Sequence, residues 1–140
     1  MSYLQNFVII DDDKLNNKLC RSIIEKIYPE SFVTEFTDPV KGFEYIADKY
    51  SQADTDERAI LLLDIMMPVM DAWAFLEAFE KLDNTVKQRV RIYILSSSID
   101  KNDMSRAQSN PYVEYYLIKP LTRESIKLIV HVLNKRLGIA

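Results

Sequence analysis

Short apolar runs alternate with stretches of helical periodicity along the whole chain. Five runs rich in branched and aromatic residues are typical of β-strands. They occupy residues 7–10, 32–36, 60–63, 91–95 and 115–118. Three of these runs show almost no alternation with polar residues, which indicates strands that are buried on both faces.

Helical periodicity separates the strand candidates. In the first series, apolar residues recur at every fourth position, which predicts a helix that buries them and ends before Pro29. This series consists of Leu15, Leu19, Ile23 and Ile27. Three further series are Val40, Phe43, Ile46 and Tyr50; Trp73, Leu76, Phe79 and Leu82; and Ile126, Ile129, Val130, Leu133 and Leu137. The stretch 100–109 is only weakly apolar and predicts a fifth helix, whereas Thr122 and Gly138 are expected to cap and to stop the last one.

Strand and helix alternate five times, which predicts an α/β fold: a doubly wound five-stranded parallel sheet flanked by five helices. Ligands bind such sheets beyond the carboxyl ends of the strands, where the strand order reverses. If the order is the flavodoxin-like 2-1-3-4-5, the first, third and fourth strands are neighbours at that point. No repeat or linker interrupts the pattern, so we expect residues 1–140 to form a single domain without an output domain.

Polar side chains stand directly after four of the five strand candidates. They are Asp11, Asp12 and Asp13 after the first, Asp64 after the third, Ser96 after the fourth and Lys119 after the fifth. Carboxylates gathered at one edge repel one another unless a cation is bound, and oxygen ligands favour Mg²⁺. A carboxylate beside such an ion can attack phosphorus and form an acyl phosphate, and Asp64 is the central candidate. Lys119 and Ser96 would then neutralise and hydrogen-bond the phosphate oxygens.

Composition excludes several other classes of protein. The net charge of -3 provides no broad attraction to nucleic acid or to anionic membranes. Cys20 is the only cysteine, which excludes an internal disulfide and a cysteine-built zinc site. Gly42 and Gly138 are the only glycines, so no glycine-rich phosphate loop for a nucleotide or flavin can be drawn. Without a signal sequence or a long apolar run, the protein is expected to be soluble and cytoplasmic.

Four motifs together resemble the receiver domain of bacterial two-component response regulators, of the chemotaxis-regulator type. They are Ile10-Asp11-Asp12-Asp13, Leu63-Asp64-Ile65-Met66-Met67-Pro68 with Asp71, Leu95-Ser96-Ser97, and Tyr116-Leu117-Ile118-Lys119-Pro120. The resemblance extends over residues 3–137. It implies the flavodoxin-like receiver fold with strand order 2-1-3-4-5.

The resemblance also implies a metal site and an acceptor. Asp64 corresponds to the aspartate that accepts the phosphoryl group. Mg²⁺, which Mn²⁺ could replace, would lie beside Asp64 and be bound directly by Asp12, through water by Asp11, and by the backbone carbonyl of Met66. Ser96 corresponds to the switch hydroxyl, Tyr116 to the switch aromatic and Lys119 to the lysine that pairs with the phosphate.

The implied function is that of a stand-alone response regulator that catalyses only its own phosphorylation and dephosphorylation. Its phosphoryl group would come from a histidine kinase, a phosphotransfer protein or a small phosphodonor. Its signal would be a conformational change on the face made by the fourth helix, fifth strand and fifth helix. An unknown protein target would read that face on a monomer or a phosphorylation-dependent dimer, with no nucleic acid or membrane as partner.

Two positions depart from the pattern of the family. Ala72 replaces the usual glycine, which would cost on the order of 1 kcal/mol if the position requires a positive φ. Met66 stands two residues after Asp64, where its apolar side chain predicts slow hydrolysis of the acyl phosphate.

Two other functions are weighed beside the receiver. An aspartyl-phosphate hydrolase of the haloacid-dehalogenase type also uses Mg²⁺, but its pattern has a second aspartate where Met66 stands. A degenerate receiver would act as a constitutive interaction module, although the acidic residues, Ser96 and Lys119 are intact. Locally, Asp13 is expected to cap the first helix, and Ser96 shares its capping potential with the two serines that follow it.

Overall fold

Five parallel strands form one sheet in the order β2-β1-β3-β4-β5. The strands are β1 (Asn6–Ile10), β2 (Phe32–Phe36), β3 (Ala59–Leu63), β4 (Val90–Ser96) and β5 (Val113–Ile118). In this computed structural model, residues 6–52, 56–136 and 138 are described. The predicted fold class and strand order are confirmed, and the uninterrupted apolar runs of β1 and β3 are buried at every position.

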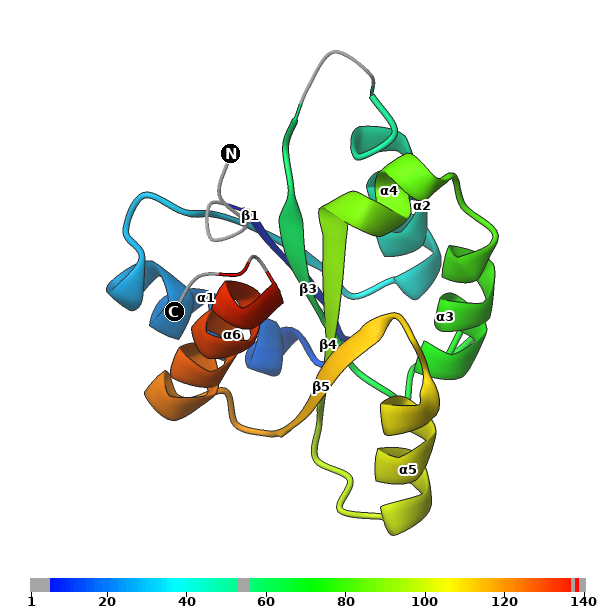
Figure 1. Cartoon of the computed structure of the whole chain (residues 1–140). Helices are drawn as coiled ribbons and strands as arrows, with labels where there is room; N and C mark the ends of the chain where they lie inside the picture. The colour runs from blue at the N-terminus through cyan, green and yellow to red at the C-terminus, as the bar shows by residue number, and fades with distance from the viewer. Residues whose placement is uncertain (1–5, 53–55, 137, 139–140) are drawn as a thin grey trace.

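Helices cover both faces of the sheet (Figure 1). The described residues contain α1 (Lys14–Ile27), α2 (Pro39–Lys49), α3 (Ala72–Glu80), α4 (Asn84–Arg89), α5 (Lys101–Ser109) and α6 (Arg123–Arg136). The prediction of five helices was wrong, because α4 is a sixth. This short helix buries only Val86, so it has no apolar periodicity by which the sequence could reveal it.

The core consists of two layers, one on each face of the sheet. Alternate residues of β1 point to opposite faces: Phe7 and Ile9 pack toward α1 and α6, and Val8 and Ile10 pack toward α2 and α3. Because both faces are buried, a one-residue slip of a strand would exchange its two sets of side chains between differently shaped layers. The register, and with it the place where each strand ends, is therefore strongly specified.

Aspartate side chains cap four of the described helices by hydrogen bonds. The side chains of Asp13, Asp38, Asp71 and Asp100 accept hydrogen bonds from backbone N–H groups of α1, α2, α3 and α5. Before α6, the Thr122 hydroxyl accepts from the Ser125 backbone N–H at 3.1 Å. Asp13, Asp71 and Asp100 lie in loops at the carboxyl edge of the sheet, so these caps also fix the loops that carry the site.

The first helix faces the sheet differently from the prediction. Leu15 and Leu19, expected inside, are 66% and 56% exposed, and the buried residues of α1 are Asn16, Asn17, Cys20 and Ile24. Side-chain amides of the two asparagines bond Asp11, which turns this side of the helix inward. Satisfied polar contacts therefore determine the rotation of α1 at its first turn.

The C-terminal end of α6 agrees with the sequence. Gly138 has a φ of 72°, and its backbone N–H bonds the Lys135 carbonyl at 3.2 Å. Leu137, expected on the last helix, lies outside the described residues. Among the described helices, none combines the length and the apolar character that crossing a bilayer requires.

The rotation of α1 predicts unequal costs for two truncations on that helix. Ile24→Ala should lower the free energy of unfolding by about 2–5 kcal/mol, because Ile24 is fully buried, whereas Leu19→Ala should change it by no more than about 0.5 kcal/mol. Urea unfolding of both variants measures the difference. Equal losses would show that Leu19 is buried after all.

Candidate metal and phosphoryl-acceptor site

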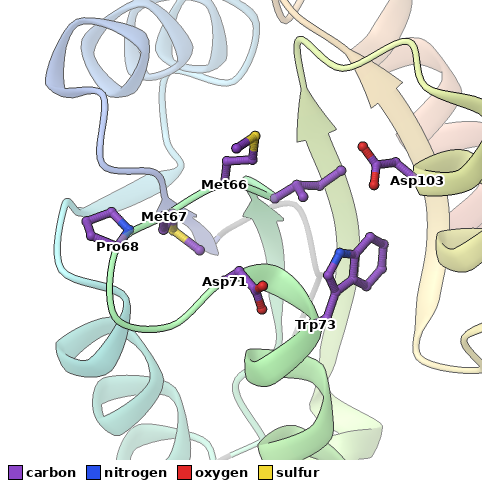
Figure 2. A pocket seen from close by; sticks show the side chains of 7 residues that line it. Met66, Met67, Pro68, Asp71, Trp73 and Asp103 are labelled. Carbon is purple, nitrogen blue, oxygen red and sulfur yellow. The ribbon is translucent and has the colours of Figure 1, made fainter.

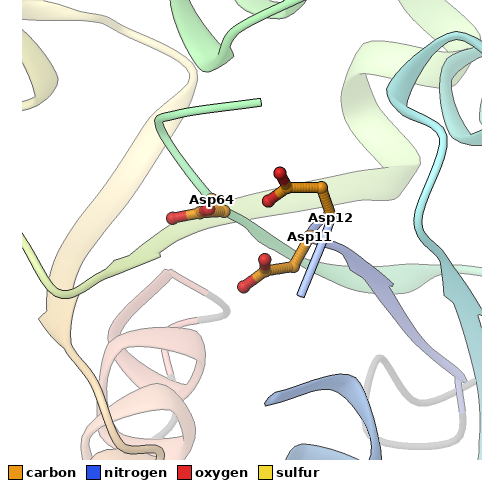
Figure 3. A group of neighbouring side chains, drawn as sticks. All are labelled: Asp11, Asp12 and Asp64. Carbon is orange, nitrogen blue, oxygen red and sulfur yellow. The ribbon is translucent and has the colours of Figure 1, made fainter. Parts of the chain in front are cut away.

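Three carboxylates meet at the carboxyl edge of β1 and β3 (Figure 3). Ile10 pairs with Leu63 in the last step of the ladder, so Asp11 and Asp64 leave the sheet side by side. The backbone N–H of Asp64 still bonds the Ile10 carbonyl at 3.0 Å. Carboxylate oxygens of Asp11, Asp12 and Asp64 lie within 4.8 Å of one another. Asp11 and Asp64 are buried, whereas Asp12 is exposed to incoming molecules.

Lys119 reaches the same cluster from the end of β5. Its backbone N–H bonds the Ser96 carbonyl at 2.9 Å, which extends the β4–β5 pairing by one residue. Its ammonium lies 2.6 Å from Asp11 Oδ2 and 3.6 Å from Asp64 Oδ1. The lysine is thus paired mainly with Asp11 and stands next to the candidate acceptor.

The cluster is electrostatically strained. Burial, and then the charge of Asp11, raises the pKa of Asp64 to about 6, while Lys119 opposes the shift. Burial alone would lower the pKa of Lys119, but its contacts with Asp11 and Asp64 outweigh this effect and raise it. One ammonium therefore offsets only part of the repulsion among three carboxylates.

Two asparagines that the sequence did not single out hold Asp11. The Asn16 side-chain amide donates to Asp11 Oδ2 at 2.9 Å, and the Asp13 backbone N–H donates to Oδ1 at 2.8 Å. The Asn17 amide donates to the Asp11 backbone carbonyl at 2.9 Å. The available signal was the pair of adjacent asparagines, Asn16 and Asn17, which begins three residues after Asp13 in the first turn of a helix with an apolar period.

Ser96 is the last residue of β4, and it is buried. Its hydroxyl accepts from the Ser98 backbone N–H at 3.1 Å, while Asp100 rather than a serine caps α5. Ser98 in turn donates from its hydroxyl to Asp103 at 2.7 Å, and its carbonyl accepts from the Tyr116 hydroxyl at 2.8 Å. The structure therefore connects Ser96 and Tyr116 through one intervening residue.

The loop after β3 contains backbone strain, but at a different residue from the one anticipated. Ala72 is buried and helical at the start of α3, and its N–H bonds the Ile65 carbonyl at 3.0 Å. Val69 has a φ of 72° instead, which is unfavourable for a β-branched residue. Alanine in place of glycine therefore leaves the helix start unstrained, and the left-handed position falls three residues earlier, at a side chain that is 95% exposed.

A cleft of about 540 Å³ lies beside this loop (Figure 2). Its lining consists of Ile65, Met66, Met67, Pro68, Asp71, Trp73 and Asp103. Asp103 comes from α5, and the neighbouring Arg106 guanidinium lies 4.6 Å from the centre of the Trp73 ring. The cleft thus lies between the loop that follows Asp64 and α5, the helix that follows Ser96 in the chain.

The residues present suit a hard divalent cation. The cluster offers carboxylate oxygens and neither sulfur nor imidazole, which matches the ligand preference of Mg²⁺. Burial, and then repulsion from Asp11, raises the pKa of Asp64, and a bound cation would offset both effects. Asp11, Asp12 and Asp64 are accordingly the side chains that could hold the ion.

Asp64 should make the stability of the metal-free protein depend on pH. Its pKa of about 6 lies above the ordinary value of 3.8, so Asp64 favours the folded state most below pH 3.8, and this contribution is lost as the pH rises through 6. Between about pH 4 and pH 7, the wild type should therefore lose up to about 3 kcal/mol relative to Asp64→Asn, measured by urea unfolding with a chelator present. Saturating Mg²⁺ should remove the difference, and parallel profiles without metal would contradict the assignment.

Comparison with known proteins places this geometry in a family. The family model for the response regulator receiver domain matches residues 7–131. A response regulator receiver protein from Dyadobacter fermentans is 24% identical, with a TM-score of 0.80 and coverage of 96% of this chain and 98% of that chain. A two-component response regulator from Cytophaga hutchinsonii is 28% identical, with a TM-score of 0.80 and coverage of 92% and 96%.

A curated relative agrees with these structures. The cyclic di-GMP phosphodiesterase response regulator RpfG of Xanthomonas campestris is 29% identical over 122 residues, which are 87% of this chain and 30% of that protein. The chain thus spans less than a third of the length of this relative. On the match over residues 7–131, the chain belongs to the response regulator receiver domain family.

Proposed function

We propose that Asp64 accepts a phosphoryl group from a histidine kinase or a phosphotransfer protein in a Mg²⁺-dependent reaction. The observation that carries the proposal is the meeting of Asp11, Asp12 and Asp64 within 4.8 Å, with the Lys119 ammonium 3.6 Å from Asp64. An oxygen of Asp64 forms a bond to phosphorus as the bond from phosphorus to the donor's imidazole nitrogen breaks, with its electron pair left on that nitrogen. The product is an acyl phosphate on a strand end.

Each neighbour of Asp64 has a part in this reaction. Mg²⁺, held by Asp11, Asp12, Asp64 and the Met66 backbone carbonyl, would supply positive charge to the phosphoryl oxygens. Lys119 supplies a second positive charge, since its ammonium already lies close to Asp64. The Ser96 hydroxyl donates a hydrogen bond to the phosphoryl group once that group is present.

The signal reaches the surface through Ser98. Turning the Ser96 hydroxyl toward Asp64 breaks its bond with the Ser98 N–H, so Ser98 must find another partner or move. Ser98 is bonded to Asp103 on α5 and to Tyr116 on β5, and both elements would respond. We therefore assign the output to the face of α5, β5 and α6. This is the same face as the one predicted from the sequence. The fourth and fifth helices of that prediction are α5 and α6 here, because α4 is an additional helix.

The central prediction is site-specific phosphorylation. Incubation with Mg²⁺ and acetyl phosphate should add the mass of one phosphoryl group to the wild type and to Asp48→Asn, an exposed control on α2, but not to Asp64→Asn. Intact-mass measurement detects the product, and a chelator should prevent it. Equal labelling of all three proteins would refute the acceptor. Failure of the wild type to label would support a constitutive interaction module, and sustained turnover of phosphomonoesters would support a hydrolase.

Met66 should govern the lifetime of the acyl phosphate. Its side chain is 77% exposed two residues after Asp64, where an apolar group cannot orient a hydrolytic water. Met66→Asn should accelerate hydrolysis by about tenfold, the effect of roughly 1.4 kcal/mol on the barrier. The decay of phosphoprotein after removal of the donor measures this rate. Val69→Asn is the matched control, because it lies on the same loop and asparagine tolerates a positive φ. An unchanged rate in Met66→Asn would eliminate the idea.

A further inference from the structure

Lys119 is engaged with another group in this structure. Its ammonium lies 2.6 Å from Asp11 Oδ2 but 3.6 Å from Asp64 Oδ1. Under the proposed function, on which this inference rests, Lys119 must pair with a phosphoryl group on Asp64. That pairing draws the ammonium away from Asp11, which is only 2% exposed. A buried carboxylate that loses a partner is strongly unfavourable, so when Lys119 leaves, Asp11 depends on the bound cation and on its remaining hydrogen-bond donors.

Asn16 is one of these donors. Its amide donates to the same oxygen, Asp11 Oδ2, at 2.9 Å, and the Asn16 side chain is itself buried. The second oxygen, Oδ1, is held by the Asp13 backbone N–H at 2.8 Å. With both bonds in place, the Asp11 carboxylate keeps two donors and one orientation after Lys119 turns to the phosphoryl group.

The amide is chemically suited to this task because it is a neutral donor. A second lysine or an arginine would satisfy Asp11 equally well but would repel a divalent cation at the same cluster. The two asparagines also differ in what they hold. Asn17 donates to the backbone carbonyl of Asp11, which joins α1 to the end of β1, whereas Asn16 holds the reactive end of the side chain.

The rotation of α1 is an independent sign that Asn16 is needed inside. A helix selected for stability alone would bury Leu15 and Leu19, yet both are exposed while Asn16 is 7% exposed. Such departures from local preference are typical of functional positions. The inward face of α1 therefore gives two buried positions to amides that bond Asp11, beside the buried Cys20 and Ile24, while two leucines stay exposed.

We propose that Asn16 is a positioning residue that holds the Asp11 carboxylate for the metal and keeps it in place when Lys119 turns to the phosphoryl group. Removing its amide leaves Asp11 dependent on Lys119. The ammonium then stays on Asp11, competes with the cation and does not reach the phosphoryl group. Metal affinity and the maximal rate of phosphorylation should both fall.

The test compares Asn16→Leu and Asn16→Ala with the wild type and with Leu15→Ala, an exposed neighbour in the same turn. Calorimetric titration of each protein with Mg²⁺ alone gives the dissociation constant. Phosphorylation by acetyl phosphate at saturating Mg²⁺ gives the maximal rate and the KM for the donor. Both Asn16 variants should bind Mg²⁺ about tenfold more weakly and show a lower maximal rate with an unchanged KM, while Leu15→Ala matches the wild type.

The outcomes separate this inference from the function it rests on. If the wild type is phosphorylated and either Asn16 variant that folds matches it in Mg²⁺ affinity and maximal rate, the positioning role is refuted and the acceptor stands. If the wild type is not phosphorylated, the proposed function fails, and with it the movement of Lys119. The role of Asn16 at the metal is then decided by the titration alone. A loss of stability in the Asn16 variants without a change in either readout would also refute the inference.

Discussion

The parallel pairing of β1 with β3 is the constraint on which the rest of the site depends. Ile10 lies opposite Leu63, so the next residue of each strand is an aspartate at the same edge. Both strands are buried along their whole length, and a slip by one residue would move every side chain to the other face. Apolar packing on two faces therefore holds two like charges together that would otherwise separate.

This arrangement stores repulsion that the core must balance. Asp64 has a raised pKa because it is buried beside Asp11, and a single ammonium from Lys119 compensates incompletely. Val69 adds a backbone in the left-handed region on the loop that follows. Strain of this kind persists only where surrounding structure imposes it, and it gathers at sites that bind or react.

Much of the fold could be predicted because strands buried on both faces have a distinctive composition. The apolar runs also located the acidic residues, Ser96 and Lys119, since each directly follows one of the predicted strands. The apolar period predicted the wrong inward face of α1. It assigns Leu15 to the inside and takes no account of the hydrogen bond by which the Asn16 amide bonds Asp11. It also missed α4, which buries a single valine.

Other features of the site depend on three-dimensional geometry that no linear pattern contains. The sequence predicts that Lys119 lies at the edge, but it does not predict which carboxylate the ammonium contacts more closely. The Lys119 ammonium lies 2.6 Å from Asp11 Oδ2 and 3.6 Å from Asp64 Oδ1. The strained position likewise falls on Val69 rather than Ala72, because α3 begins at Ala72 and the chain must reverse before it.

Under the proposed function, the position of Ser98 would link a change at Asp64 to the surface formed by α5 and β5. Its backbone N–H, carbonyl and hydroxyl are bonded to three different elements: Ser96 on β4, Tyr116 on β5 and Asp103 on α5. Ser98 is half-buried, so a movement that releases the Ser96 bond leaves its backbone N–H partly shielded from water and shifts the strain onto the other two bonds. If Asp64 accepts a phosphoryl group as proposed, these hydrogen bonds connect a displacement of Ser96 to α5 and β5.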